Sequence, residues 1–574
     1  MDEIGSILKL YFQYHDQYTK KYGKNTVVLM QLGTFYEIYE VKNKEVTLGA
    51  DVRKLADILD IQATRKNKNI EEINFKNPSQ CGVPLAGFTK YRDILLNHNY
   101  TIVIVDQVTE PPNVEREVTN IISPGTAIEN YNQSDMMNTL VSIYIDFCCS
   151  AVDSNKKTYF VGVSAIDIST GNNYVHKIQS TATDENLWID ELFRLIHFYS
   201  PKEILYHYDT NKIDLTREKI STLWELNENI IHINVCDHKQ FHKNSYQNEY
   251  LKQIFPNTNF LSPIEYLGFE RDTEITKSYI YMLQFIHEHK IDNLKDLPKP
   301  IHKGDQQHLV LSHNCMYQLY LITNKEHSSE KYNSLLNIIN DCNTAIGRRL
   351  CKERLLYPII DSNKLKERYE LISQFQLQED GKYVYDMIRS DLKKIIDVEK
   401  LHRKMNLLLL SPYQFFELHT SYSYVLKIIN QLEKSLPDLI DNYNTTIHGM
   451  NQLRNDYTQL LNMKELEKYN MNNMITSVFN QGIYPDIDDL NNKINESKEL
   501  IKIICDKLSI YIDRKKDNII KNETDKKNGY HIYITENRSK IFKQSIKNLK
   551  NTIITYKCRN KEYTLDLKDI RFIK

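Results

Sequence analysis

The sequence predicts a multidomain fold in which two mixed α/β regions precede a long all-α region and a small β region. The chain has 574 residues, too many for one hydrophobic core, because single domains hold about 100–200 residues. Short β-branched runs alternate with helical patterns as far as about residue 260. From about residue 265 to residue 516, apolar residues recur at intervals of three and four, and strand-like alternation then returns.

The first region, residues 1–130, is expected to be mixed α/β. Strand-like runs at 27–30 and 101–105 lie on either side of a helical pattern at 52–59. The turn sequence at 123–125, which contains Pro and Gly, marks the end of this region.

Residues 131–262 are expected to form a second α/β region with a ribonuclease-H-like sheet. The pattern is two strands, a turn and a third strand, followed by a helix and another strand. These elements are expected at 141–147, 159–168, 173–178, 187–199 and 201–206.

Residues 263–516 are expected to be helical, and their last helix is expected to be long. No Gly or Pro occurs at 486–516, and apolar residues there step by three and four, which is a heptad seam. At 1.5 Å per residue this helix would extend on the order of 45 Å. Residues 517–574 alternate in short stretches and are expected to form a small β region. The seam comprises Ile487, Leu490, Ile494, Ser497, Ile501, Ile504, Leu508 and Tyr511.

Charge and cysteine usage exclude several classes of protein. Lys and Arg (74) balance Asp and Glu (75), so a globally basic nucleic-acid binder is excluded. Residues 514–561 are nevertheless locally basic, with 14 Lys and Arg against 4 Asp and Glu. Nine scattered Cys without a C-x-x-C pair indicate reduced thiols in an intracellular compartment. No apolar run approaches the roughly 20 residues of a membrane helix, and the acidic N-terminus is not a secretory signal.

Catalytic motifs are absent from the sequence, so we expect no enzymatic activity of this chain. No glycine belongs to a G-x-x-x-x-G-K-[ST] phosphate loop, and neither H-E-x-x-H nor G-x-S-x-G occurs. Asp146 and Asp167, on predicted strands of the second region, are the one arrangement that suggests a ribonuclease-H-like nuclease. Such a two-metal site needs more carboxylates, and no third is clear. The nuclease is therefore the weaker hypothesis.

The sharpest local signal is the pentapeptide Gly33-Thr34-Phe35-Tyr36-Glu37. Glycine allows close backbone approach at the end of a strand, and in an extended stretch Phe35 and Glu37 project the same way. An aromatic side chain can wedge between base pairs from the minor groove, and a carboxylate beside it can accept a hydrogen bond from a base edge. The alternative is a plain strand with Phe35 in the core and Glu37 in solvent.

Further motifs follow this pentapeptide in a fixed order, and together they resemble the N-terminal mismatch-recognition domain of the MutS family of DNA mismatch-repair sensors. The family pattern G-x-F-Y-E, then G-[VI]-P, then R-x-V with [TS]-P-G-T, is matched in order and spacing. The matching segments are 33–37, 63–66, 80–84, 91, 100–107, 116–118 and 123–126.

The resemblance extends over nearly the whole chain. Residues 162–171 resemble the family's connector, and residues 334–358 are similar to its core signature. Arg354-Leu355 stands where the family usually has Trp-Leu, so local packing must differ there. The last region resembles an atypical clamp, which fits the giant-virus and octocoral-mitochondrial branch of the family.

The resemblance implies a sensor of mispairs or small loops in double-stranded DNA, with Phe35 and Glu37 reading bases. It implies a mismatch-recognition domain (1–130), a ribonuclease-H-like connector (131–262), a helical core with a descending lever helix (263–516) and an incomplete β clamp (517–574). The residues implied to contact the DNA backbone are Arg65, Lys66, Arg538, Lys540, Lys543, Lys547 and Lys550.

The ATPase of the family does not occur in this sequence, so a fragment or a split gene is expected. ATP, magnesium and a homodimer are expected only for a full-length relative, and no cofactor or metal is expected within this chain. Two further hypotheses stay open. One is a MutS-like binder of branched or recombining DNA, although such relatives tend to lack the Phe-x-Glu pair. The second is a fragment that folds but binds nothing alone.

Overall fold

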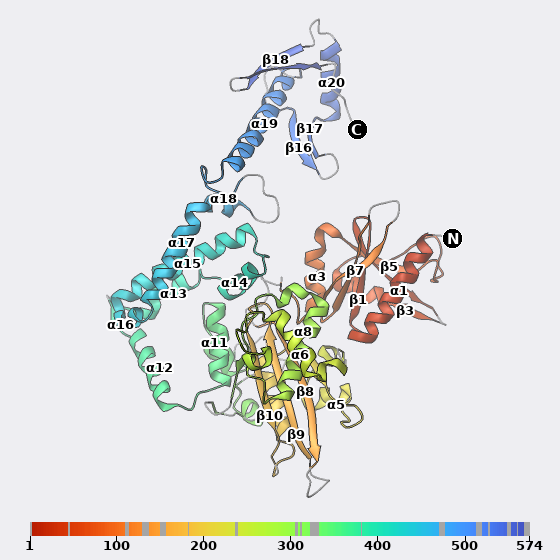
Figure 1. The fold of residues 1–574 in the computed structure, drawn as a ribbon. Coiled ribbons are helices and arrows are strands. Elements are labelled where there is room, and N and C mark those ends of the chain that lie inside the picture. Colours follow the sequence, from red (N-terminus) through yellow and green to blue (C-terminus); the bar gives the residue numbers. More distant parts are fainter. Residues whose placement is uncertain are drawn as a thin grey trace. The chain divides into compact units, whose positions relative to one another are not determined.

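The computed structural model of the chain contains two compact units, Met1–Leu410 with Glu417–Asn442, and Ser411–Phe416 with Tyr443–Lys574. Figure 1 labels the helices and strands along the chain. The structure describes residues 3–43, 46–109, 114–128, 137–149, 157–181, 183–235, 239–304, 308–309, 311, 313–321, 332–379, 381–469, 477–512, 519–525, 529–547, 553–558 and 561–567.

The first sheet has the strand order β4-β5-β2-β1-β6-β7, with β3 beside β2. Tyr39 of β2 meets Tyr11 of α1, whereas Tyr36 of the same strand meets Phe88 of α3. Because odd and even positions of a strand face opposite ways, α1 and α3 cover opposite faces of this sheet. The elements are α1 (Glu3–Tyr22), β1 (Thr26–Leu32), β2 (Phe35–Lys42), β3 (Thr47–Gly49), α2 (Val52–Leu59), β4 (Thr64–Arg65), β5 (Ser79–Pro84), η1 (Leu85–Gly87), α3 (Phe88–Asn97), β6 (Thr101–Gln107) and β7 (Arg116–Ile122).

Helix α2 lies where the sequence predicted it, at residues 52–59. Asp51 accepts a hydrogen bond from the backbone N–H of Lys54 and so caps the first turn. Asp60 ends the helix in the left-handed conformation. Local capping and an apolar face therefore suffice to define this helix.

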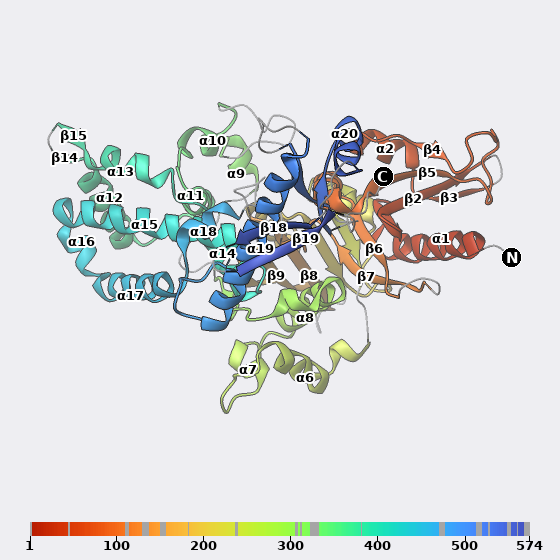
Figure 2. The same ribbon diagram turned by 90° about the horizontal axis from the view of Figure 1, so that it is seen from above.

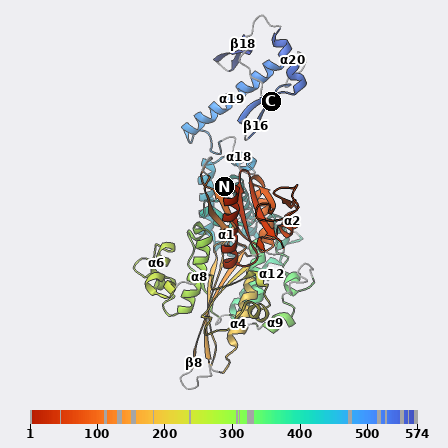
Figure 3. The same cartoon turned by 90° about the vertical axis from the view of Figure 1, so that its right-hand side faces the viewer.

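The second sheet has the strand order β12-β11-β8-β9-β10-β13. Strands β8 and β9 form a long antiparallel hairpin, while β8 and β11 run parallel, in agreement with the predicted mixed α/β arrangement. Figure 3 shows α4 and α8 on opposite sides of this sheet. The elements are β8 (Thr139–Cys149), β9 (Lys157–Asp167), β10 (Asn173–Gln179), α4 (Leu187–Tyr199), β11 (Glu203–His207), α5 (Arg217–Leu223), η2 (Glu228–Ile230), β12 (Ile231–Ile233), η3 (Lys239–His242), α6 (Asn244–Ile254), α7 (Pro263–Leu267), α8 (Thr273–His289), η4 (Ile291–Leu294) and β13 (Ile301–His302).

Helix α8 packs directly on β8 and β9, and Figure 2 shows it alongside these strands. A Cβ atom at Gly162 of β9 would lie only 2.1 Å from the carbonyl oxygen of Glu274 in α8, so this approach requires glycine. Both α8 and β13 lie beyond residue 262, where the sequence placed the start of the helical core. The structural unit around the second sheet therefore extends into that region.

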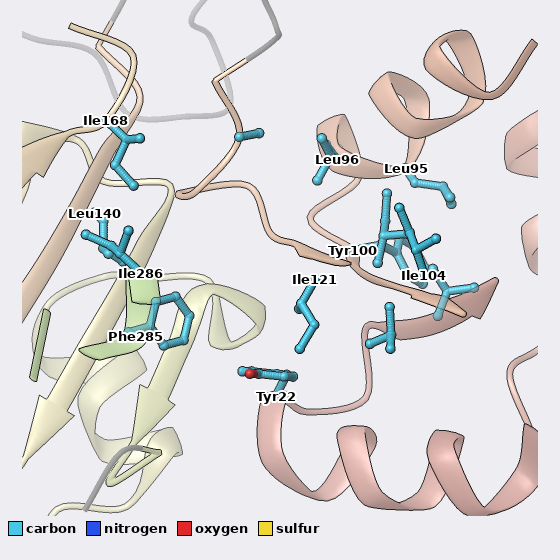
Figure 4. Close-up of a cluster of buried hydrophobic side chains, with 14 of the residues drawn as sticks. Tyr22, Leu95, Leu96, Tyr100, Ile104, Ile121, Leu140, Ile168, Phe285 and Ile286 are labelled. Atoms are coloured by element: carbon cyan, nitrogen blue, oxygen red, sulfur yellow. The ribbon is translucent and has the colours of Figure 1, made fainter. Parts of the chain in front are cut away.

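The two sheets share one apolar core. Tyr22 at the end of α1 packs edge-on against Phe285 of α8, with ring centroids 6.1 Å apart. Ile121 of β7 and Leu140 of β8 belong to the same buried cluster, as Figure 4 shows. The first sheet is thus anchored to the second by burial of side chains from both.

Helices dominate the remainder of the first unit, as predicted. Arg349 of α11 pairs with Asp397 at 2.7 Å, and its guanidinium also donates to Glu399 of α14, so these two helices are linked by a partly buried ion-pair network. The elements are α9 (His313–Gln318), α10 (Leu335–Ile339), α11 (Ala345–Leu356), α12 (Ser362–Phe375), β14 (Gln378–Glu379), β15 (Lys382–Tyr383), α13 (Val384–Leu392), α14 (Val398–Asn406), α15 (Pro412–Ser435) and α16 (Pro437–Asp441).

The second unit contains the long helix predicted from the heptad seam. This helix, α19, ends at Ser509, before the predicted end at residue 516, and residues 513–518 lie outside the described part of the chain. Leu508 is buried, whereas Leu490 and Ile494 of the same seam are exposed. The elements are α17 (Asn444–Leu460), α18 (Met463–Lys468), α19 (Pro485–Ser509), β16 (Lys521–Asp525), β17 (Gly529–Tyr533), α20 (Glu536–Lys547), β18 (Ile553–Cys558) and β19 (Lys561–Asp566).

One local prediction in this unit is wrong. We expected the basic residues from Arg538 onward to lie on a β element, but they lie on the helix α20. The segment consists mostly of good helix formers, and its apolar residues Phe542 and Ile546 are four apart and pack on the same small core. The predicted β structure is present on either side of this helix, as the antiparallel hairpins β16–β17 and β18–β19, although no strand was predicted at Lys521–Asp525.

No helix in the described part of the chain combines the length and the apolar character needed to cross a membrane.

Candidate nucleic-acid interface

The pentapeptide at 33–37 forms the tip and the first residues of a tight β-hairpin. Strands β1 and β2 are antiparallel, with Leu32 opposite Phe35, so only Gly33 and Thr34 connect them. Gly33 has a φ of +58°, in the left-handed region that favours glycine. The backbone N–H of Leu85 donates to the carbonyl of Thr34 at 3.0 Å and ties the tip to the end of β5. The tip is therefore held by backbone contacts on both sides.

Phe35 and Glu37 share one face of β2, as the sequence predicted. Phe35 is 46% exposed, and Glu37 is half-buried. Tyr36, between them, is buried on the opposite face, where its hydroxyl donates to Asp106 at 2.7 Å. The exposure of Phe35 argues against the hypothesis that placed this side chain in the core.

The Glu37 carboxylate accepts a hydrogen bond from the hydroxyl of Tyr39, two residues along the same face of β2. On the neighbouring strand β5, Gly82 lies opposite Glu37. A Cβ atom there would lie 3.1 Å from the carbonyl oxygen of Tyr36 and 3.4 Å from Cγ of Glu37. Glycine thus leaves the side of Glu37 that faces β5 open.

Hydrogen bonds from two other strands brace the end of β1 next to the hairpin. Gln31 accepts at its side-chain oxygen from the backbone N–H of Gln107 at 2.9 Å, and its carbonyl accepts from Nε of Arg116 at 3.1 Å. In the sequence, Arg116 was predicted only as part of a motif, and Gln31, Gln107 and Tyr39 were not predicted as parts of this site. Because every second residue of a strand lies on the same face, the alternation that pairs Phe35 with Glu37 also places Tyr39 on that face.

The predicted backbone contacts in the first domain are Arg65 and Lys66. The Arg65 guanidinium donates to the carbonyl oxygens of Glu71 at 3.0 Å and Lys68 at 3.3 Å, so it organises the loop that follows β4. Lys66 is exposed. Of the pair, Lys66 has the side chain that a phosphate could approach, and both DNA contacts stay predictions.

The predicted basic residues of the second unit divide between two sides of α20. With about 100° of rotation per residue, Lys540, Lys543 and Lys547 fall within a sector of roughly 60°, whereas Arg538 falls more than about 130° from that sector's centre. All four side chains are exposed. Lys540 also pairs with Glu536 at 3.4 Å on the surface. Lys550 lies outside the described residues.

The two aspartates that suggested a nuclease do not converge. On the β8–β9 hairpin, Asp146 lies opposite Phe160 and Asp167 lies opposite Thr139. Seven positions along the strand separate these pairs, which corresponds to roughly 23 Å. Asp167 is buried and accepts a 2.6 Å hydrogen bond from Ser169. Among the described residues, no cluster of His, Cys, Asp or Glu could hold a metal ion.

Comparisons with known proteins identify two matching domain families and several similar proteins. The family model of MutS domain I matches residues 10–131, and that of MutS domain III matches residues 314–556. The mutS homolog of Acanthamoeba polyphaga mimivirus is 30% identical over 96% of this chain and 51% of its own length.

Two other relatives also match this chain over about half of their own length. The DNA mismatch repair protein MutS of Alkaliphilus metalliredigens is 25% identical over 93% of this chain and 55% of its own length. The mitochondrial mutS homolog of Sarcophyton glaucum is 25% identical over 75% of this chain and 47% of its own length. This chain thus spans about half the length of the curated relatives it matches.

Proposed function

This chain belongs to the MutS family, and we propose on that premise that it binds double-stranded DNA at mispairs or small loops. In this proposal Phe35 is the wedge that enters the helix from the minor groove, and Glu37 contacts a base edge beside it. The duplex backbone is held separately by the lysine face of α20, defined as Lys540, Lys543 and Lys547.

The observation that carries the proposal is an exposed aromatic side chain on a braced hairpin, followed on the same face by a carboxylate. A wedge must unstack a base step, which costs a few kcal/mol in an intact duplex. The cost is lower at a mispair, where stacking is already weak. A hairpin tip fixed on both sides directs the ring without losing further backbone entropy on binding.

Glu37 contributes selectivity in this proposal rather than affinity. A carboxylate near DNA is repelled by phosphates, so it lowers binding to every duplex alike. It offsets that repulsion only where a base edge offers it a hydrogen-bond donor. A mispaired or looped base exposes such donors more readily than a paired base does.

The lysine face of α20 supplies the complementary function. Phosphate contacts position a protein on DNA without reading its sequence. They also make binding salt-dependent, because each neutralised phosphate releases counterions. Three lysines within one sector of a helix are suited to follow a single phosphate strand.

The test is a binding measurement by fluorescence anisotropy with a matched duplex and with the same duplex containing one mispair or one unpaired base. We expect the intact chain to prefer the mispaired or looped duplex, and Phe35→Ala to remove a preference of roughly tenfold to a hundredfold, since base–aromatic stacking is worth about 1–3 kcal/mol. Phe260→Ala is the matched control, because Phe260 is also an exposed phenylalanine but lies outside the first sheet domain. A chain that binds all duplexes equally would contradict the proposal.

A further inference from the structure

The hydroxyl of Tyr39 is held in place on β2. Tyr39 is buried, and its ring packs edge-on against Tyr11 of α1 with centroids 5.2 Å apart. Tyr11 is itself fully buried in the core of the first domain. The ring of Tyr39 therefore cannot swing away, and its hydroxyl is presented at one place on the face that carries Phe35 and Glu37.

This hydroxyl donates a hydrogen bond to one carboxylate oxygen, Oε2, of Glu37. Among the described residues, the Glu37 carboxylate has no other hydrogen bond or ion pair. Its cross-strand neighbours are Met30 and Gly82, neither of which can donate from a side chain. Tyr39 is thus the side chain that determines how the Glu37 carboxylate is turned, and the second oxygen, Oε1, remains available.

We propose that Tyr39 is a positioning residue for mismatch discrimination, which fixes the Glu37 carboxylate so that Oε1 is directed to the base edge. This inference rests on the proposed function. A free glutamate would lose rotamer entropy on binding, whereas a carboxylate already fixed by Tyr39 loses less. The benefit arises only with duplexes that Glu37 contacts, so it appears in the preference and not in general affinity.

The state of the phenol supports this role. Burial, and then the hydrogen bond and the negative charge of Glu37, raise the pKa of Tyr39. The phenol therefore keeps its proton and remains a donor over the pH range in which the protein is handled. An ionised carboxylate can only accept hydrogen bonds, so the Tyr39 hydroxyl is the donor and Glu37 the acceptor.

The chain contains a matched control on the same strand. Tyr36 also donates a phenol hydrogen bond to a carboxylate, Asp106, at 2.7 Å, but on the opposite face of the sheet. Its pKa is likewise raised by burial and by Asp106. Tyr36→Phe and Tyr39→Phe therefore remove the same chemical group and a comparable bond, but only the Tyr39 hydroxyl donates to Glu37.

The experiment measures affinities of the whole chain for matched and mispaired duplexes. We expect Tyr39→Phe to lower the mispair preference roughly threefold to tenfold, the value of one net hydrogen bond, and to leave matched-duplex affinity unchanged. Tyr36→Phe should keep the full preference. In a Glu37→Ala background, Tyr39→Phe should cause no further change, because a positioning residue acts only through the group it positions. Thermal melts of both Phe variants check that each is folded.

The outcomes separate this inference from the proposed function. If the unaltered chain shows no preference for a mispair, the proposed function fails and this inference fails with it. If the preference exists and survives Tyr39→Phe, only the role of Tyr39 is refuted. An equal loss on Tyr39→Phe with and without Glu37 would also refute it, because the tyrosine would then act independently of the carboxylate.

Discussion

The hydroxyl of Ser123 donates a 2.5 Å hydrogen bond to the buried carboxylate of Glu203. Ser123 follows the last strand of the first sheet, and Glu203 begins β11 of the second sheet. The same carboxylate accepts from the backbone N–H of Gly125 at 2.8 Å and contacts Nε2 of His232 at 3.0 Å. One carboxylate thus joins the turn that ends the first domain to the centre of the next.

Loss of Glu203 should destabilise this joint. Burial alone would raise the pKa of Glu203, but His232 and Ser123 outweigh burial and lower it, so the group is a stabilised anion. We expect Glu203→Ala to lower the free energy of unfolding of the first unit by about 3–5 kcal/mol, as when one partner of a buried pair is removed. Urea unfolding followed by circular dichroism measures this.

Two variants control for that result. Glu203→Gln should cost less, because an amide still accepts from Ser123 and Gly125. Glu228→Ala, at an exposed position, should change stability by no more than about 0.5 kcal/mol. Equal effects of Glu203→Ala and Glu228→Ala would show that the joint does not depend on this carboxylate.

The buried ring of His207 on β11 makes stability depend on pH. It stacks on Tyr281 with centroids 3.8 Å apart, and among the described residues neither ring nitrogen has a hydrogen-bond partner. Burial lowers its pKa from 6.5 to about 3. Above pH 6.5 the ring is neutral in both states, whereas between pH 6.5 and about 3 only the unfolded chain binds a proton. The free energy of unfolding should therefore fall by about 1.4 kcal/mol for each pH unit lowered through this window.

His207→Phe isolates this contribution, because phenylalanine keeps the stacking and removes the titration. Urea midpoints are measured between pH 7 and pH 4. As the pH falls, the midpoint of the unaltered protein should drop more than that of the variant. Other titrating groups are common to both proteins and cancel in the difference. Parallel pH profiles for the two proteins would mean that His207 takes up its proton at the same pH in the folded and unfolded chains, which would contradict the lowered pKa.

The hairpin of the candidate site was predictable because its signals are local. Gly33 marks the turn, and the period of two along a strand places Phe35 and Glu37 on one face. The hydrogen bond from Tyr39 was not predicted, because it depends on a ring held by Tyr11 from another element. The bond from Ser123 to Glu203 likewise has no local signal, since its partners come from different domains.

The error at α20 has a different cause. The spacing of Lys540, Lys543 and Lys547 is three and four, a helical period that was present in the sequence. The whole region was expected to be a β clamp, so this helical period was not used to predict a helix. Because the segment is a helix, Arg538, which had been grouped with the lysines, lies on another side of it.

Phe35→Ala should leave the fold intact, whereas Ile38→Ala should not. Phe35 is exposed at the hairpin, and Ile38, on the same strand, is fully buried on the opposite face. We expect about 1 kcal/mol or less for Phe35→Ala and about 2–5 kcal/mol for Ile38→Ala. Thermal melts of the two variants measure the contrast. A drop as large for Phe35→Ala as for Ile38→Ala would show that Phe35 is a core residue.

Glu37→Gln should tighten binding to every duplex and reduce the preference for a mispair. The amide keeps an acceptor but loses the charge that phosphates repel. Glu72→Gln, at an exposed position in the loop after β4, removes the same charge away from β2. It should leave the preference unchanged. If both variants reduced the preference equally, the effect would reflect total charge and not the position of Glu37.

The lysine face of α20 should determine how binding depends on salt. Each phosphate neutralised contributes about 0.9 to the slope of log affinity against log salt. Replacing Lys540, Lys543 and Lys547 with Ala should therefore flatten the slope by roughly 3 and weaken matched and mispaired duplexes alike. Anisotropy titrations at several salt concentrations measure both quantities.

Arg538→Ala provides the contrast within the same helix. It removes one positive charge, as Lys543→Ala does, but from another side of α20. If a duplex lies along the lysine face, Lys543→Ala flattens the slope by about 1 and Arg538→Ala leaves it nearly unchanged. If both substitutions flatten it equally, the helix acts only through its net charge. If neither does, the duplex is bound elsewhere, and the assignment of these lysines to phosphate contacts is wrong.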